Sequence, residues 1–96
     1  MYTSRAHFPT AQGSRYLQQL CKHLAHKVEV TYSETEAEGA LPTGHMRLKA
    51  DETGLHAEVT SEDLSGIIQA RYVIDKHLVT FAFRDSFSGF SWALAD

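Results

Sequence analysis

The chain has few of the features that mark a secreted or membrane-spanning protein. It holds one cysteine in 96 residues, so no intrachain disulfide can form, and a single thiol fits a reducing compartment. No apolar run approaches the roughly 18 residues that cross a membrane. The N-terminus lacks the basic start and apolar stretch of a signal peptide. These absences predict a cytoplasmic protein.

Positive charge is also scarce. Nine lysines and arginines face twelve aspartates and glutamates, which gives a formal net charge of -3. Nucleic acids and anionic membranes require a basic surface on the protein, so neither is an expected partner. The share of apolar residues, 43%, is typical of a globular protein, and the length predicts one domain over residues 1–96.

The stretch RYLQQLCKHLAHK, residues 15–27, predicts an amphipathic helix. Its apolar residues recur at helical spacing and place Cys21 in the stripe that faces the core. His23 lies on the flank between core and solvent, and His26 lies almost opposite Cys21. The apolar stripe consists of Leu17, Leu20, Cys21, Leu24 and Val28.

Alternating apolar and polar residues predict strands at residues 2–8 and 28–33. The acidic segment that follows, with Glu36 and Glu38, is expected to form an exposed connection. This connection leads to a short edge strand at residues 40–42, because proline cannot donate to a central ladder.

A hairpin is the clearest local feature of the sequence and spans residues 46–59. A four-residue turn, DETG, places the apolar residues of both strands on one face. The same register puts Lys49 opposite His56 on the other face. It also predicts a cross-strand ion pair between Arg47 and Glu58.

A second helix is predicted from residues 60–63 to about Phe83, with an apolar face broad enough to need cover on two sides. The aromatic tail at residues 87–94 is one natural cover, and a dimer interface is the alternative. Arg71 and Asp75 lie four residues apart inside this apolar face. A partly buried ion pair is preferred for them over a polar anchor in a ligand pocket.

The element order β-α-β-β-β-β-α predicts the α+β class, with an antiparallel sheet of four to five strands and two helices packed on one face. No phosphate-binding glycine loop, CxxC, HExxH or GxSxG motif is present. No catalytic residue is therefore assigned, and a small hydrolase or isomerase ranks last among the functions considered.

Thiolate and imidazole are ligands that zinc and iron prefer, which directs attention to the first helix and to His77. Cys21, His23 and His26 point to such different sides of one helix that they cannot share an ion. His23 and His77 each border the apolar face of their helix, so their rings meet if the helices are neighbours. The alternative is that both histidines are structural and that Cys21 is a small core residue.

The outward face of the hairpin carries a second histidine-rich row. His45 and His56 share this face with Arg47 and Lys49. The row has suitable chemistry for an anion, but a solvated surface is the preferred interpretation, and His7 is interpreted in the same way.

Three stretches together resemble an uncharacterised bacterial family, the domain of unknown function 2218. They are RYLQQLCKHLAHK, KADETGLHAEV and IDKHLVTFAFRDSFSGFSW, and the resemblance covers nearly the whole chain. It implies a loose link to iron acquisition, since similar segments occur beside siderophore-interacting proteins. The positions it marks are Arg15, Tyr16, Leu20, Cys21, His23, His26, Lys27, His77, Leu78, Phe81, Arg84 and Trp92.

Two functions therefore lead. The first is a small binding module whose ligand site includes His23, His77, Arg84 and Tyr16. In the most specific form of this hypothesis, the module binds a transition metal such as zinc or iron through His23, His77 and His26, or it binds a protein of an iron-siderophore pathway. The second is a protein-interaction domain that forms a homodimer through the apolar far side of the second helix and the tail.

Overall fold

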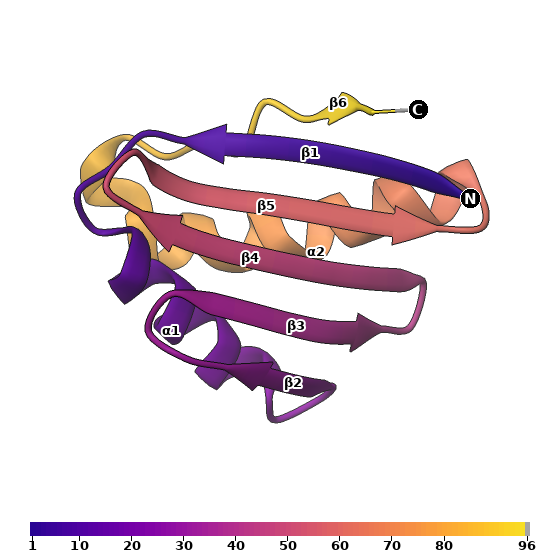
Figure 1. Ribbon diagram of the computed structural model, residues 1–96, viewed down its shortest axis with the longest axis horizontal. Helices are drawn as coiled ribbons and strands as arrows, with labels where there is room; N and C mark the ends of the chain where they lie inside the picture. The colour runs from indigo at the N-terminus through magenta and orange to yellow at the C-terminus, as the bar shows by residue number, and fades with distance from the viewer. Residues whose placement is uncertain (96) are drawn as a thin grey trace.

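Two helices cover one face of a six-stranded antiparallel sheet and leave the other face open to solvent (Figure 1). The computed structural model describes residues 1–95. The strand order is β2-β3-β4-β5-β1-β6. Along the chain the elements are β1 (Tyr2–Phe8), α1 (Gly13–Leu24), β2 (Glu29–Tyr32), β3 (Glu36–Leu41), β4 (Gly44–Asp51), β5 (Gly54–Ser61), α2 (Leu64–Ala82), the 3-10 turn η1 (Phe83–Asp85) and β6 (Ala93–Leu94).

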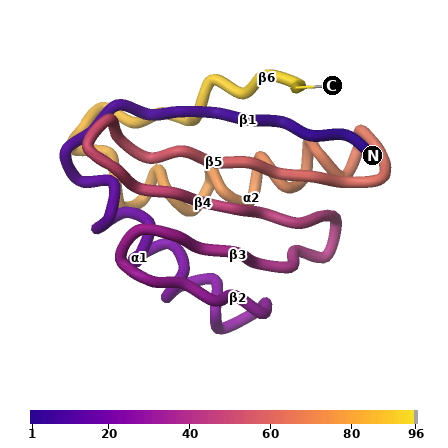
Figure 2. Tube along the Cα trace, viewed as in Figure 1, coloured from indigo at the N-terminus to yellow at the C-terminus, as the bar shows by residue number. Residues whose placement is uncertain are grey.

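The α+β class is confirmed, but the sheet has six strands where four to five were predicted. The additional strand, β6, lies in the aromatic tail and pairs with β1, so the first and last strands are neighbours at one edge (Figure 2). Two residues are too few to show the alternation by which a strand is recognised in a sequence. For this reason the tail was expected only to cover α2.

The predicted edge strand at residues 40–42 is also wrong. β3 begins at Glu36 and lies between β2 and β4, so it is an interior strand. Its acidic residues, Glu36 and Glu38, alternate with residues that face the helices, because every second residue of β3 reaches the open face. Acidic composition therefore concealed a regular strand.

The hairpin of β4 and β5 has the predicted register. Leu48 pairs with Ala57, and Lys49 pairs with His56, so the apolar residues face the helices and the charged ones face solvent. Both helices pack on the apolar side and share one hydrophobic core with it. The largest fully buried side chains of this core include Leu17, Leu20, Met46, Leu55, Ile67, Ile74 and Leu78.

The aromatic tail covers one flank of α2, which is the first of the two alternatives predicted for its cover. Phe87 and Phe90 are buried, and their rings pack edge-to-face 5.2 Å apart. Phe90 makes a similar contact with Trp92. Within the described residues, no helix is both long and apolar enough to cross a membrane.

The predicted ion pair between Arg71 and Asp75 does not form. Arg71 donates through Nε and Nη2 to the buried Ser4 hydroxyl, at 3.0 and 2.7 Å. Asp75 instead accepts hydrogen bonds from the Phe90 amide and the Trp92 indole, at 3.1 and 3.0 Å. Burial raises the pKa of Asp75 despite these donors. The two polar residues inside the apolar face thus anchor β1 and the tail to α2.

Candidate functional site

His23 on α1 and His77 on α2 lie side by side, as the amphipathic pattern of the two helices predicted. Their ring centroids are 4.8 Å apart, and the ring planes are tilted by 50°. His23 is exposed and His77 is half-buried, so the pair sits at the solvent edge of the groove between the helices. Phe81, one turn after His77, contacts the His23 ring edge-to-face with centroids 6.1 Å apart.

The proton on the His77 ring is located by its hydrogen bond. Nδ1 lies 2.6 Å from the carbonyl oxygen of Val73, and a carbonyl oxygen can only accept, so Nδ1 carries the hydrogen. In the neutral ring the lone pair is therefore on Nε2. Metal-binding histidines commonly have their other ring nitrogen anchored in this way. His23 forms no side-chain hydrogen bond with residues 1–95, so no hydrogen bond fixes the orientation of its ring.

The other predicted metal ligands do not join this pair. His26 lies in the turn after α1 and is exposed. Cys21 is completely buried, and burial raises the pKa of its thiol to about 11, so it is not a thiolate at neutral pH. Across residues 1–95, no group of three or more His, Cys, Asp or Glu side chains is placed to hold a metal ion.

Tyr16 and Arg84, the two other predicted ligand-binding residues, have their own contacts. Tyr16 is buried, and its hydroxyl donates to Asp85 Oδ2 at 2.7 Å. Burial, and then the neighbouring Asp85 carboxylate, raise the pKa of Tyr16. The exposed Arg84 lies over the Phe83 ring, 5.6 Å from its centroid. A ligand-binding role for either residue stays a prediction.

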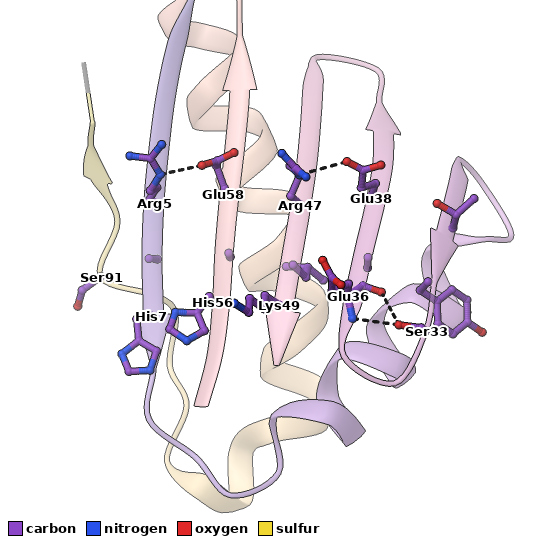
Figure 3. Close-up of a pocket in the computed structure, with 16 residues that line it drawn as sticks. Arg5, His7, Ser33, Glu36, Glu38, Arg47, Lys49, His56, Glu58 and Ser91 are labelled. Atoms are coloured by element: carbon purple, nitrogen blue, oxygen red, sulfur yellow. Dashed lines mark hydrogen bonds and ion pairs between the residues drawn. The ribbon is translucent and has the colours of Figure 1, made fainter. Parts of the chain in front are cut away.

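A larger hollow lies on the open face of the sheet and has a volume of about 1040 Å³ (Figure 3). It is about twice the size of two others, of about 540 and 530 Å³. Strands β1 to β5 supply nearly all of its lining, since alternate residues of each strand point out of the sheet. The acidic, basic and histidine side chains that line it are Arg5, His7, Glu36, Glu38, Arg47, Lys49, His56 and Glu58.

Charges of alternating sign form a row across four neighbouring strands of this hollow. Arg5 Nε binds Glu58 Oε2 at 2.7 Å, and Arg47 Nε lies 3.1 Å from Glu38 Oε1 (Figure 3). The predicted ion pair between Arg47 and Glu58 is therefore wrong, although the two residues are directly opposite in the register. Glu58 pairs with Arg5 on β1, and Arg47 pairs with Glu38 on β3 instead.

The next row holds a second pair of histidines. His7 and His56 lie opposite each other on β1 and β5, and their rings stack 4.4 Å apart with planes within 15° of parallel. Lys49 follows on β4, opposite Glu36 on β3. Lys49 forms no ion pair with any residue in 1–95, and neither does Glu36 beside it.

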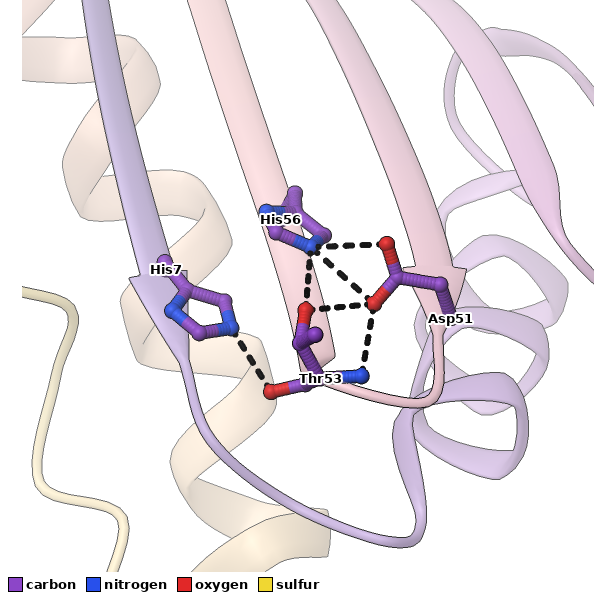
Figure 4. A network of polar contacts seen from close by, with 4 residues as sticks. All are labelled: His7, Asp51, Thr53 and His56. Atoms are coloured by element: carbon purple, nitrogen blue, oxygen red, sulfur yellow. Dashed lines mark hydrogen bonds and ion pairs between the residues drawn. The ribbon is translucent and has the colours of Figure 1, made fainter.

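A polar network anchors both stacked rings (Figure 4). His56 Nε2 lies 3.2 Å from both carboxylate oxygens of Asp51, and His7 Nε2 lies 2.8 Å from the Thr53 carbonyl oxygen. Thr53 also donates to Asp51 through its amide and its hydroxyl, at 2.8 and 2.6 Å. These Thr53 hydrogen bonds, followed by that from His56, hold the pKa of Asp51 well below its usual value.

The histidine stack was missed at the sequence level because two different registers create it. The hairpin pattern placed His56 on the outward face, and the alternation in β1 placed His7 there too. The pairing of β1 with β5 joins segments from opposite halves of the chain, and no local pattern reports it. An outward histidine on each of two strands was the only available indication.

The fold and its sites define a class of small α+β proteins. In this class, helices cover one face of the sheet, a histidine pair lies between the helices, and the open sheet face is charged. The chain belongs to the family described as "Uncharacterized protein conserved in bacteria (DUF2218)", whose profile matches residues 5–93. This confirms the resemblance drawn from the three sequence stretches.

A solved structure supports the same fold. The chain is similar to PA4090 from Pseudomonas aeruginosa, determined by NMR, with 26% sequence identity and a TM-score of 0.79. The similarity covers 97% of this chain and 96% of PA4090. No protein with a curated description matches the chain.

Proposed function

We propose that this chain is a small binding module that takes a transition-metal ion between α1 and α2, with His23 and His77 as the protein ligands. The observation that carries the proposal is the contact between the two rings, 4.8 Å apart, together with the bond that fixes the His77 proton on Nδ1. Imidazole suits zinc, copper and iron among the divalent metals. Water or a second molecule would complete the coordination of an ion held by two histidines.

The other histidine pair is less suited to an ion. The rings of His7 and His56 are nearly parallel, and both are anchored through Nε2, so their Nδ1 lone pairs run side by side and do not converge. His23 and His77 are tilted by 50°, and only His77 is anchored. A turn of the His23 ring alone therefore brings a nitrogen of each residue towards one ion.

The family resemblance supplies a context for this site without defining it. Its link to iron acquisition favours ferrous iron, or the metal of a siderophore-related ligand, as the ion. Arg84 and Tyr16 remain proposed contacts for the organic part of such a ligand. The single buried thiol, Cys21, supports the proposal that the module works in the reducing cytoplasm.

Isothermal titration calorimetry with Zn²⁺, and with Fe²⁺ under anaerobic conditions, tests the proposal. We expect one site in the wild type and sharply weaker binding in His23→Ala and in His77→Ala. His26→Ala is the matched control, since it removes an exposed histidine from the turn just after α1. Absence of binding in the wild type, or binding in His23→Ala and His77→Ala as tight as in the wild type, would rule the site out.

A second candidate function rests on Lys49 in the hollow of the open face. Lys49 lacks an ion pair within residues 1–95, whereas Arg5 and Arg47 are each held by a glutamate. The hollow is also as large as a typical small-molecule site. We propose that it takes a small carboxylate- or phosphate-bearing ligand at Lys49.

An NMR titration with citrate and with inorganic phosphate tests this second candidate. Amide shifts at Lys49 and His56 are expected in the wild type and are expected to be lost in Lys49→Gln. Lys27→Gln is the control, because Lys27 is exposed and lies outside the hollow. Shifts that persist in Lys49→Gln would refute the assignment.

A further inference from the structure

Large apolar side chains face solvent along one side of α2 and the turn that follows it. They are 37–62% exposed and recur every four or seven residues, so they form a row along the helix. This row contains five of the eight exposed large apolar residues found within 1–95, so the exposure is concentrated in one place. The row consists of Leu64, Ile68, Tyr72, Val79 and Phe83.

Neither neighbour of α2 covers this row. The first helix packs against the opposite flank, where His23 contacts His77 and Phe81. The tail is held by the Phe90 amide and the Trp92 indole at Asp75, which lies between Tyr72 and Val79 at helical spacing, and the five apolar side chains of the row stay exposed. The tail was expected to cover the far side of α2, but it leaves these five side chains exposed.

The spacing of the row is symmetric. The midpoint between Leu64 and Phe83, at the ends of the row, is the peptide bond between residues 73 and 74. Ile68 and Val79 have the same midpoint, and Tyr72 lies close to it. In an antiparallel pair of α2 helices related by a two-fold axis at this point, Leu64 meets Phe83 of the second copy. Ile68 likewise meets Val79 of the second copy. Every apolar residue at the two ends of the row thus finds an apolar partner, as a self-complementary interface requires.

The charges at the ends of the helix follow the same symmetry. Asp63 at the start of α2 and Arg84 just after its end share the midpoint of the row. Both are exposed, and neither forms an ion pair within residues 1–95. The antiparallel arrangement places Asp63 of each copy at the level of Arg84 of the other, and it places Glu62 at the level of Asp85 in the same way.

We infer that this face of α2 binds a second copy of the same chain, as an antiparallel two-fold pair of helices. The symmetric spacing of the apolar row selects this occupant. A single helix pair makes a small interface, so the dimer forms in a concentration-dependent way. The inference is independent of the metal site, which lies on the other flank of α2.

Sedimentation equilibrium over a series of protein concentrations tests the dimer. The wild type is expected to shift from monomer to dimer as concentration rises, and Ile68→Glu is expected to stay monomeric. Gln69→Glu makes the same charge change at the adjacent exposed position and is expected to dimerise like the wild type. A wild type that is monomeric throughout, or variants that behave alike, would overturn the inference. Circular dichroism confirms that each variant is folded.

Cysteine cross-linking tests the antiparallel orientation. Oxidation of a mixture of Ile68→Cys and Val79→Cys proteins is expected to give a disulfide between the two variants. Ile68→Cys alone is expected to give far less disulfide-linked dimer, because residue 68 of one copy lies well away from residue 68 of the other in the antiparallel pair. The natural Cys21 is buried and does not compete. Efficient cross-linking of Ile68→Cys with itself would contradict the antiparallel arrangement.

Discussion

The hydroxyl of Tyr16 donates a 2.7 Å hydrogen bond to Asp85 Oδ2 and thereby ties α1 to the turn that ends α2. The hydroxyl of Thr10, just before α1, donates to the same oxygen at 2.8 Å. Both bonds stabilise the carboxylate form, so the pKa of Asp85 lies below its ordinary value of 3.8, with Tyr16 the larger cause. One carboxylate thus links α1 and the segment before it to the turn that follows α2.

This bond predicts a pH-dependent loss of stability in Tyr16→Phe. A lowered carboxyl pKa in the folded state adds stability at neutral pH, and that stability is lost as the pH falls through the folded-state pKa. The variant should therefore unfold more easily than the wild type at neutral pH, and the difference should shrink as the pH drops below the ordinary carboxyl value. Urea unfolding at several pH values measures this. Tyr32→Phe, at an exposed tyrosine, is the control, and a difference that is constant across pH would contradict the explanation.

Substitution of Gly66 by alanine has two opposite effects on stability, one through helix propensity and one through packing. Alanine in place of glycine normally stabilises a helix interior by about 0.5–1 kcal/mol. At Gly66 an added Cβ would overlap the Ser61 hydroxyl and lie 2.5 Å from the Thr43 carbonyl oxygen. We therefore expect Gly66→Ala to lower the free energy of unfolding by roughly 1–3 kcal/mol, as overpacking does. The exposed neighbour gives the control Ser65→Ala, and a Gly66→Ala protein as stable as the wild type would refute the close approach.

The fold could be predicted from the sequence where the determining pattern is local. The hairpin register, Lys49 opposite His56, follows from alternation on both sides of a four-residue turn, and the structure has it. The approach of His23 to His77 follows from two amphipathic helices on one face of a sheet. In both cases the side-chain positions depend on periodicity within a short segment.

Contacts between distant segments could not be predicted in this way. Arg71 binds Ser4, which is 67 residues away, and Asp75 binds the tail, so spacing on the helix gave the wrong partner for each. The stack of His7 on His56 depends on the pairing of β1 with β5. The choice of Arg47 for Glu38 depends in turn on Arg5, a residue two strands away in the sheet.

The ion-pair row on the open face makes a prediction for double-mutant cycles. Alanine substitutions at Arg47 and Glu38 should show a coupling of about 0.2–1 kcal/mol, the range for exposed pairs. The cycle for Arg47 with Glu58 is the control and should show little coupling, although the register places these two residues opposite each other. The reverse order of the two couplings would contradict the observed pairing.

The state of the His77 ring under metal is the most direct test of the proposed function. Long-range ¹H–¹⁵N spectra of the histidine side chains report each ring nitrogen separately, before and after Zn²⁺ is added. We predict that the hydrogen of His77 stays on Nδ1, bonded to Val73, while His77 Nε2 and one nitrogen of His23 shift together. Unchanged spectra for both residues, or a shift confined to His7 and His56, would contradict a metal site between the helices.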